Sequence, residues 1–236
     1  MKKIDLTSVC IILIVSLISF LTSNNPFVCI GVLLIYSLYY FIFARKNLKT
    51  FYEKSRRIHQ CYYFVTTYLL TMSIKESYDD AFENAIKNKN DEFSKILDEL
   101  QEMNSLEKID YLSKYFTYSF YHMFLKVINL YQDQGGNILK MSSSLLNETI
   151  RVEETMNESE TNSKKKAIEF FILWSLSFVV ILFMRFALQN FYLGMLKSIP
   201  FFVILVSFYV LFFVAVHIFI TRYTKMPINE EGKFNE

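Results

Sequence analysis

The chain has 236 residues, of which 53% are hydrophobic and 20% are charged, and it contains 24 phenylalanines and 16 tyrosines. This composition is too apolar for a soluble domain and too charged for a bundle lying wholly in a membrane, so the apolar residues must be segregated along the chain. The net charge is only +2, and the basic residues form no single exposed stripe, which disfavours binding to nucleic acid.

Four nearly uncharged stretches carry most of the apolar residues: Leu6–Leu21, Val28–Phe43, Phe170–Leu188 and Phe201–Thr221. A helix that spans a bilayer needs about 20 apolar residues. The last two stretches are long enough, and the first two need tilt or a tight hairpin. Asn25-Pro26 favours a turn between the first pair. We therefore predict two transmembrane hairpins, at residues 1–43 and 167–222.

A secretory signal peptide is an alternative interpretation of Met1–Leu21, because Lys2 and Lys3 precede the apolar run. No small-x-small cleavage site follows that run, and the second apolar stretch begins only a few residues later. We therefore favour a retained transmembrane helix.

Basic residues flank all four apolar stretches on what the pattern indicates is one side of the membrane. They are Lys2, Lys3, Arg45, Lys46, Lys49, Lys164, Lys165, Lys166, Arg222 and Lys225. The two short connecting loops carry only Lys197. Because cytoplasmic flanks are enriched in Lys and Arg, we expect a protein of the inner (cytoplasmic) membrane. Both termini, residues 44–166 and the tail 223–236 would be cytoplasmic, and the basic flanks would contact lipid headgroups.

Residues 44–166 show helical rather than strand periodicity, which predicts an antiparallel helical bundle. The expected helices are Leu48–Leu70, Ile74–Lys87, Asp91–Met103, Leu106–Tyr118 and Phe120–Tyr131. The second follows a break at Thr71-Met72-Ser73, with Ser73 as its N-cap and Glu76 completing a capping box. The fold class is therefore all-α, with four transmembrane helices in two hairpins flanking a cytoplasmic bundle.

A helix-break motif, Gly135-Gly136-Asn137, divides the bundle from the element that follows. Adjacent glycines supply the positive φ angles that end a helix, and an asparagine can cap the next one. Beyond it, an apolar stripe runs down one helix face at Ile138, Met141, Leu145, Leu146 and Ile150. The helix is expected to continue through Lys164-Lys165-Lys166 into the third apolar stretch, as a stalk that enters the membrane.

This layout resembles the type II secretion F-domain family, the inner-membrane platform proteins of type IV filament machines, and is most similar to the single-bundle platform proteins of tight-adherence pili. Family helix starts read Gly-x-Ser-Leu-x-x-Ala-Leu and Gly-Gly-x-Leu. Here they appear as Met72-Ser73-Ile74-Lys75-Glu76-Ser77-Tyr78-Asp79-Asp80-Ala81-Phe82 and Gly135-Gly136-Asn137-Ile138. The first of these lacks the family's glycine.

The resemblance implies a platform that couples a cytoplasmic secretion or pilus assembly ATPase to the extraction of pilin or pseudopilin subunits. It also implies homo- or hetero-oligomers, including contact with a second platform paralogue. An acidic set is a candidate docking surface for the ATPase: Asp79, Asp80, Glu83, Asp98, Glu99 and Glu102. A solvated face of the bundle is the alternative interpretation of the same residues.

The sequence predicts no enzymatic chemistry and no cofactor. Five glycines leave no phosphate-binding loop, and His59, His122 and His217 have no histidine or cysteine at metal-ligand spacing. The cysteines are expected to stay reduced, and the paired carboxylates lack a pocket pattern. A membrane-embedded His217 is either a neutral ring bonded between helices or a functional group. Arg185 either extends to the interface or forms a functional ion pair.

Two further classes stay open, a subunit of a small-solute transporter and a membrane sensor or scaffold. A transporter is expected to show broken helices and polar groups near the membrane midplane, whereas only Gly31 interrupts the second apolar stretch. A sensor is expected to have an extracytoplasmic domain, whereas both outer loops are short.

Overall fold

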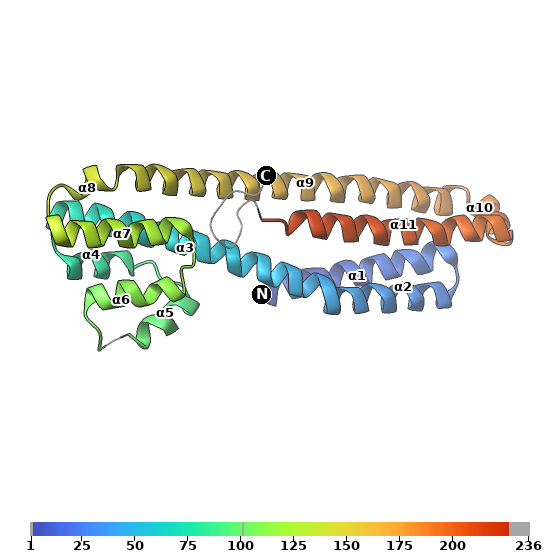
Figure 1. The fold of residues 1–236 in the computed structure, drawn as a ribbon. Helices are drawn as coiled ribbons and strands as arrows, with labels where there is room; N and C mark the ends of the chain where they lie inside the picture. Colours follow the sequence, from blue (N-terminus) through green and yellow to red (C-terminus); the bar gives the residue numbers. More distant parts are fainter. Residues whose placement is uncertain (1, 101, 227–236) are drawn as a thin grey trace. The chain divides into compact units, whose positions relative to one another are not determined.

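The computed structural model describes residues 2–100 and 102–226, without the side chains of residues 2–7 and 91. Within these residues every regular element is helical (Figure 1), which confirms the predicted all-α class. The side chains of Lys2 and Lys3 and most of the predicted tail, residues 227–236, lie outside the description. The described chain divides into two compact units, unit 1 (residues 2–51 and 162–225) and unit 2 (residues 52–161 and 226).

Unit 1 contains α1 (Lys2–Ser23), α2 (Pro26–Tyr39), the π-helix η1 (Tyr40–Ala44), α10 (Gln189–Leu196), α11 (Ile199–Tyr223) and the C-terminal part of α9 (Ser143–Ala187). The predicted turn between α1 and α2 is present. The Asn25 side chain accepts a hydrogen bond from the Phe27 amide at 2.9 Å, and Pro26 opens α2, which is where proline fits a helix best.

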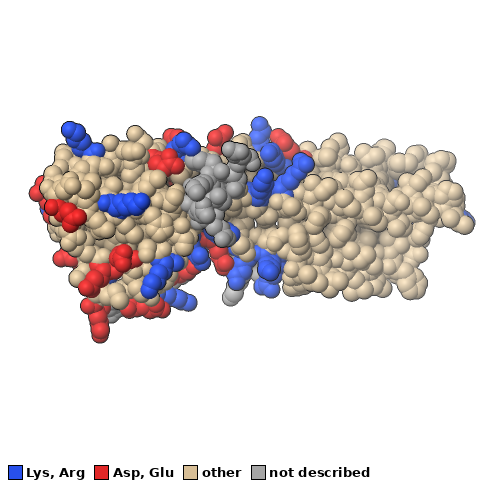
Figure 2. All heavy atoms as spheres, in the orientation of Figure 1, with Lys and Arg blue, Asp and Glu red and all other residues tan. Residues whose placement is uncertain are grey.

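The core of unit 1 is aromatic, whereas its outer surface consists of exposed aliphatic and phenylalanine side chains. Trp174 packs against Phe212 with ring centroids 4.7 Å apart, and Phe178 lies 5.1 Å from the same ring. Ile172 and Phe183 on α9 are 64% and 67% exposed. Figure 2 shows the surface of this unit as almost uncharged over most of its length, with Lys and Arg gathered at one end. Such a surface is stable in lipid and unfavourable in water.

Three helical stretches are long and apolar enough to cross a membrane: Pro26–Lys75, Ser143–Ala187 and Ile199–Tyr223. The first of these is the continuous run of α2, η1 and α3 (Arg45–Lys75). The first predicted span falls in a shorter apolar helix, Ser8–Ser23. The length and composition of these helices support a membrane-embedded protein, and its described elements are all helical.

Unit 2 is a helical bundle around the 52–75 part of α3. Its other helices are α4 (Tyr78–Ala85), α5 (Asp91–Asp98), α6 (Ser105–Tyr111), the 3₁₀ turn η2 (Leu112–Lys114), α7 (Ser119–Gln134), α8 (Ile138–Met141) and residues 143–161 of α9. Phe64 of α3 is fully buried and lies 5.9–6.2 Å from the rings of Phe93, Phe116, Tyr121 and Phe124. This aromatic cluster joins α3, α5 and α7 into one core.

The predicted break at Thr71–Ser73 is wrong, because α3 continues to Lys75. The chain turns at Glu76, whose φ is +54°, and Ser77 caps α4 by accepting a bond from the Asp80 amide at 3.3 Å. Ser73 instead donates to the Leu70 carbonyl of its own helix at 2.7 Å. The capping box predicted for Ser73 and Glu76 does not form, because a polar residue within a helix can bond to the preceding turn and leave the helix intact.

The long helix predicted for the stalk forms, with two differences from the prediction. α8 and α9 are separated at Ser142, and α9 then runs unbroken for 45 residues. The buried stripe consists of Ile138, Ser142, Leu145, Thr149, Val152 and Met156, at alternating steps of four and three. Ile150, predicted to lie on this stripe, is 44% exposed. Thr149 takes an inner position because its hydroxyl donates to the Leu145 carbonyl at 3.0 Å, which satisfies the polar group.

Candidate functional site

The helix-break motif forms as predicted at one end of unit 2. Gly135 and Gly136 have φ angles of +64° and +106°, and the Gly135 amide donates to the Tyr131 carbonyl at 2.8 Å. Asn137 Oδ1 accepts a bond from the Lys140 amide at 3.0 Å. The motif thus ends α7 and starts α8 without any other side chain.

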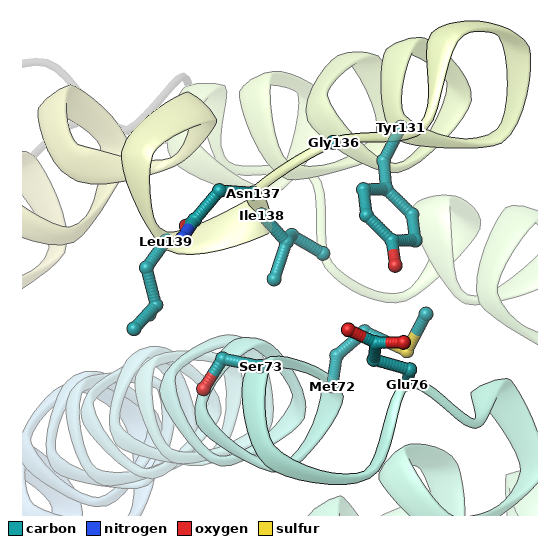
Figure 3. Close-up of a pocket in the computed structure, with 8 residues that line it drawn as sticks. All are labelled: Met72, Ser73, Glu76, Tyr131, Gly136, Asn137, Ile138 and Leu139. Atoms are coloured by element: carbon teal, nitrogen blue, oxygen red, sulfur yellow. The ribbon is translucent and has the colours of Figure 1, made fainter.

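A hollow of about 280 Å³ lies between this motif and the α3–α4 turn. Met72, Ser73 and Glu76 line one side of it. Figure 3 shows the other side, where Tyr131 points its hydroxyl toward the α3 end and Ile138 lies across from Ser73. Among the described residues, no hydrogen bond or ion pair engages the Glu76 carboxylate or the Tyr131 hydroxyl. We refer to this feature as the end hollow.

The six acidic residues of the predicted docking surface lie on α4 and around the C-terminal end of α5, and all six are exposed or half-buried. Figure 2 shows acidic atoms concentrated on the part of unit 2 that holds α4, α5 and α6. Two of them have partners within the bundle. Asp79 accepts a bond from the Ser105 hydroxyl of α6, and Asp80 pairs with Lys75 at 3.3 Å. Glu83, Asp98, Glu99 and Glu102 are exposed to solvent.

The predicted basic flanks belong to unit 1, at the start of α3 and in α9. Arg45, Lys46, Lys164, Lys165 and Lys166 are all exposed. Each stands next to the apolar part of its helix, since Phe41 and Ile42 precede Arg45, and Ile168 follows Lys166. This is the arrangement that lipid headgroups favour at the edge of a membrane helix.

A polar cluster that the sequence did not indicate joins α3 to α9 within unit 2. His59 Nδ1 lies 3.0 Å from Glu153 Oε2, and His59 Nε2 lies 3.3 Å from Glu160 Oε1. Ser55, one turn before His59, donates to the same Glu160 oxygen. A carboxylate only accepts, so the doubly protonated ring is the form that makes both bonds at once. The sequence feature that could have indicated this cluster is the seven-residue spacing of Glu153 and Glu160, which places both on one helix face. Spacing alone does not show which helix that face contacts.

A second cluster links α3 to α5. Glu92 accepts from Arg57 at 2.7 Å and from Arg56 at 3.0 Å. The Arg57 guanidinium lies 5.2 Å from the ring centre of Tyr115. Burial, together with the Glu92 charge, raises the pKa of Tyr115 from 10.0 to about 12. Burial also raises the pKa of the Cys61 thiol, which is fully enclosed in the core, so this thiol is neutral and unreactive in the folded protein.

The two membrane residues singled out earlier each have a partner in unit 1. His217 Nδ1 lies 3.1 Å from the Tyr39 hydroxyl, which joins α11 to α2. Arg185 Nε donates to the Leu21 carbonyl at 3.1 Å, near the C-terminal end of α1, where a cation offsets the negative end of the helix dipole. Both groups have a structural hydrogen bond between helices.

Hydroxyl groups are also paired inside unit 1. The Thr22 hydroxyl lies 2.7 Å from the Tyr209 hydroxyl, and Tyr192 donates to the Thr22 carbonyl at 2.9 Å. Tyr36 donates to the Tyr209 carbonyl at 3.0 Å. These bonds tie α1, α2, α10 and α11 together in a setting where unsatisfied polar groups are costly.

Within the described part of the chain, no group of three or more His, Cys, Asp or Glu side chains is placed to hold a metal ion. Comparisons with protein-family models, with curated proteins and with solved structures found no match to this chain. The structure supports a coarse class: a chain whose described elements are helical, with three helices long and apolar enough to cross a membrane in addition to a charged helical bundle in unit 2.

Proposed function

We propose that this protein is a platform of a type IV filament machine, in the inner membrane, which couples a cytoplasmic assembly ATPase to pilin or pseudopilin subunits. In this proposal both termini and unit 2 are cytoplasmic. The apolar part of the chain forms four spans in two hairpins, the first of them within α1. The resemblance of the helix starts and the pattern of basic flanks support this assignment.

The observation that carries the proposal is α9. Residues 143–161 of this helix pack into the bundle of unit 2, through Leu145, Val152 and Met156, and residues 162–187 belong to unit 1. An unbroken helix transmits rigid-body motion better than a flexible tether. A force applied to unit 2 by an ATPase is therefore passed along α9 into the membrane.

The acidic surface of unit 2 is the proposed contact for the ATPase. Glu83, Asp98, Glu99 and Glu102 are exposed, and acidic surfaces steer basic partners and set the specificity of the encounter. Reversing the charge at Glu83 and Glu99 together is expected to lower co-purification of the ATPase with the full-length protein. The double variant Glu154→Lys and Glu158→Lys, at two exposed positions on α9, is the matched control.

The test of transmission is an insertion of two glycines directly after Glu160. We expect filament assembly to be lost while the protein still inserts and accumulates in the membrane. The same insertion after Asn88, in the turn between α4 and α5, is the control and is expected to be tolerated. Normal filaments with the α9 insertion would refute a mechanical role for this helix.

A further inference from the structure

The end hollow is bordered by apolar surface that unit 2 leaves uncovered. Ile74 is 81% exposed, more than any other large apolar side chain described in unit 2, and Leu70 is 47% exposed. Leu70, Ser73 and Ile74 share one face of α3, by their spacing of three and four, and Ser73 lines the hollow. Leu139, 38% exposed, lines the other side. In the proposed topology this surface lies outside the membrane, where exposed apolar side chains of this kind are typical of a protein interface.

The polar groups of the end hollow favour a cation. The Glu76 carboxylate lines it, and the Tyr131 hydroxyl and ring and the Ser73 hydroxyl lie beside it. Asp79 and Asp80 follow directly on α4. The neighbouring cations are Lys75, which is paired with Asp80 at 3.3 Å, and Lys140, which is exposed on α8. The charged group that lines the hollow is therefore the Glu76 carboxylate, which pairs with no cation among the described residues.

The backbone at Glu76 supports a role beyond folding. Its φ of +54° lies in the left-handed region, where a side chain costs about 1–2 kcal/mol and glycine fits freely. Glutamate therefore occupies a position at which glycine would suit the turn better. Positions that break a local backbone rule tend to be functional.

We propose that the end hollow binds one lysine or arginine side chain from an amphipathic helix of a second protein. The aliphatic stem of that side chain lies against Met72 and Ile138, and its charged head reaches Glu76 and Tyr131. Apolar residues one turn away on the same helix cover Leu70 and Ile74. This inference rests on the proposed function, because it specifies the kind of helix by which a partner protein binds to unit 2.

The test is photo-crosslinking of the full-length protein in the membranes of its own cells, with benzoyl-phenylalanine in place of Ile74. We expect an adduct to a single helical peptide of another protein that contains Lys or Arg. The substitution Glu76→Gln should lower the yield of this adduct about tenfold, and Glu76→Arg should abolish it. Exchanging the crosslinked basic residue for glutamate should restore the adduct with Glu76→Arg. Benzoyl-phenylalanine at Lys126, exposed on α7 and outside the acidic surface, is the control and should give no such adduct.

Each other outcome contradicts the inference: no adduct, an adduct to lipid or to a second copy of this chain, or a yield that Glu76→Gln leaves unchanged. Protection of Cys61 from maleimide shows in each variant that unit 2 is folded. The proposed function fails separately. A basic helix from a protein that is neither an assembly ATPase, nor a pilin or pseudopilin, nor a platform paralogue would uphold the inference and overturn the function. An ATPase that crosslinks at Glu83 and not at Ile74 would do the opposite.

Discussion

Replacing Glu76 by glycine should stabilise unit 2, although the substitution removes a charged side chain and adds no packing contact to the core. Without a side chain at this left-handed position, the backbone strain is relieved, which stabilises the folded state by about 1–2 kcal/mol. The greater freedom of glycine in the unfolded chain offsets about 0.5–1 kcal/mol of that gain. We expect a net stabilisation of about 1 kcal/mol, a large effect because it changes the ratio of closed to open molecules about fivefold.

The buried thiol of Cys61 provides the assay, because a maleimide reaches it only when unit 2 opens. In full-length protein carrying Cys10→Ala and Cys29→Ala, Glu76→Gly should slow the labelling of Cys61 about fivefold. Glu83→Gly removes the same side chain from an exposed position inside α4, where glycine costs about 0.5–1 kcal/mol, and should speed labelling. Equal or faster labelling with Glu76→Gly would refute the strained turn.

Three further predictions concern unit 2. His59→Ala, which removes the bonds to Glu153 and Glu160, should lower stability by about 1 kcal/mol in the Cys61 assay, whereas His122→Ala at an exposed position should have no effect. Gly136→Ala should speed Cys61 labelling at least tenfold, because its φ of +106° excludes a side chain, and an unchanged rate would contradict the turn geometry. The neutral Tyr115 phenol stabilises the fold below pH 10 and loses this contribution as pH rises toward its folded pKa of about 12. The thermal midpoint followed by circular dichroism should fall over that range, less steeply in Tyr115→Phe, and a midpoint equally steep in both proteins would contradict the shift.

The sequence predicted those features that depend on neighbouring residues. The turn at Asn25-Pro26 forms where it was predicted, with the Asn25 side chain accepting a bond from the Phe27 amide at 2.9 Å. The helix break at Gly135-Gly136-Asn137 was likewise predicted, because the positive φ angles and the N-cap bond follow from these residues themselves. Local signals of this kind are complete within four or five residues, so they can be read without knowledge of the fold.

Features that depend on tertiary contacts were not predictable in the same way. The α3–α4 turn was misplaced because a glutamate, rather than a glycine, takes the left-handed conformation at position 76. The cluster of His59, Glu153 and Glu160 depends on the pairing of α3 with α9. Thr149 entered the core because it bonds to its own helix, a route that a pattern of apolar residues does not register.

Impermeant maleimide labelling of intact cells tests the central claim, that unit 2 is cytoplasmic and that the membrane segments end in short outer loops. Single cysteines at Thr117, exposed in unit 2, and at Gln189, exposed at the start of α10, would be compared in a background without the three native cysteines, Cys10→Ala, Cys29→Ala and Cys61→Ala. The proposal predicts labelling at position 189 on intact cells and at position 117 only after the cells are opened. Labelling at position 117 on intact cells would contradict the proposed platform.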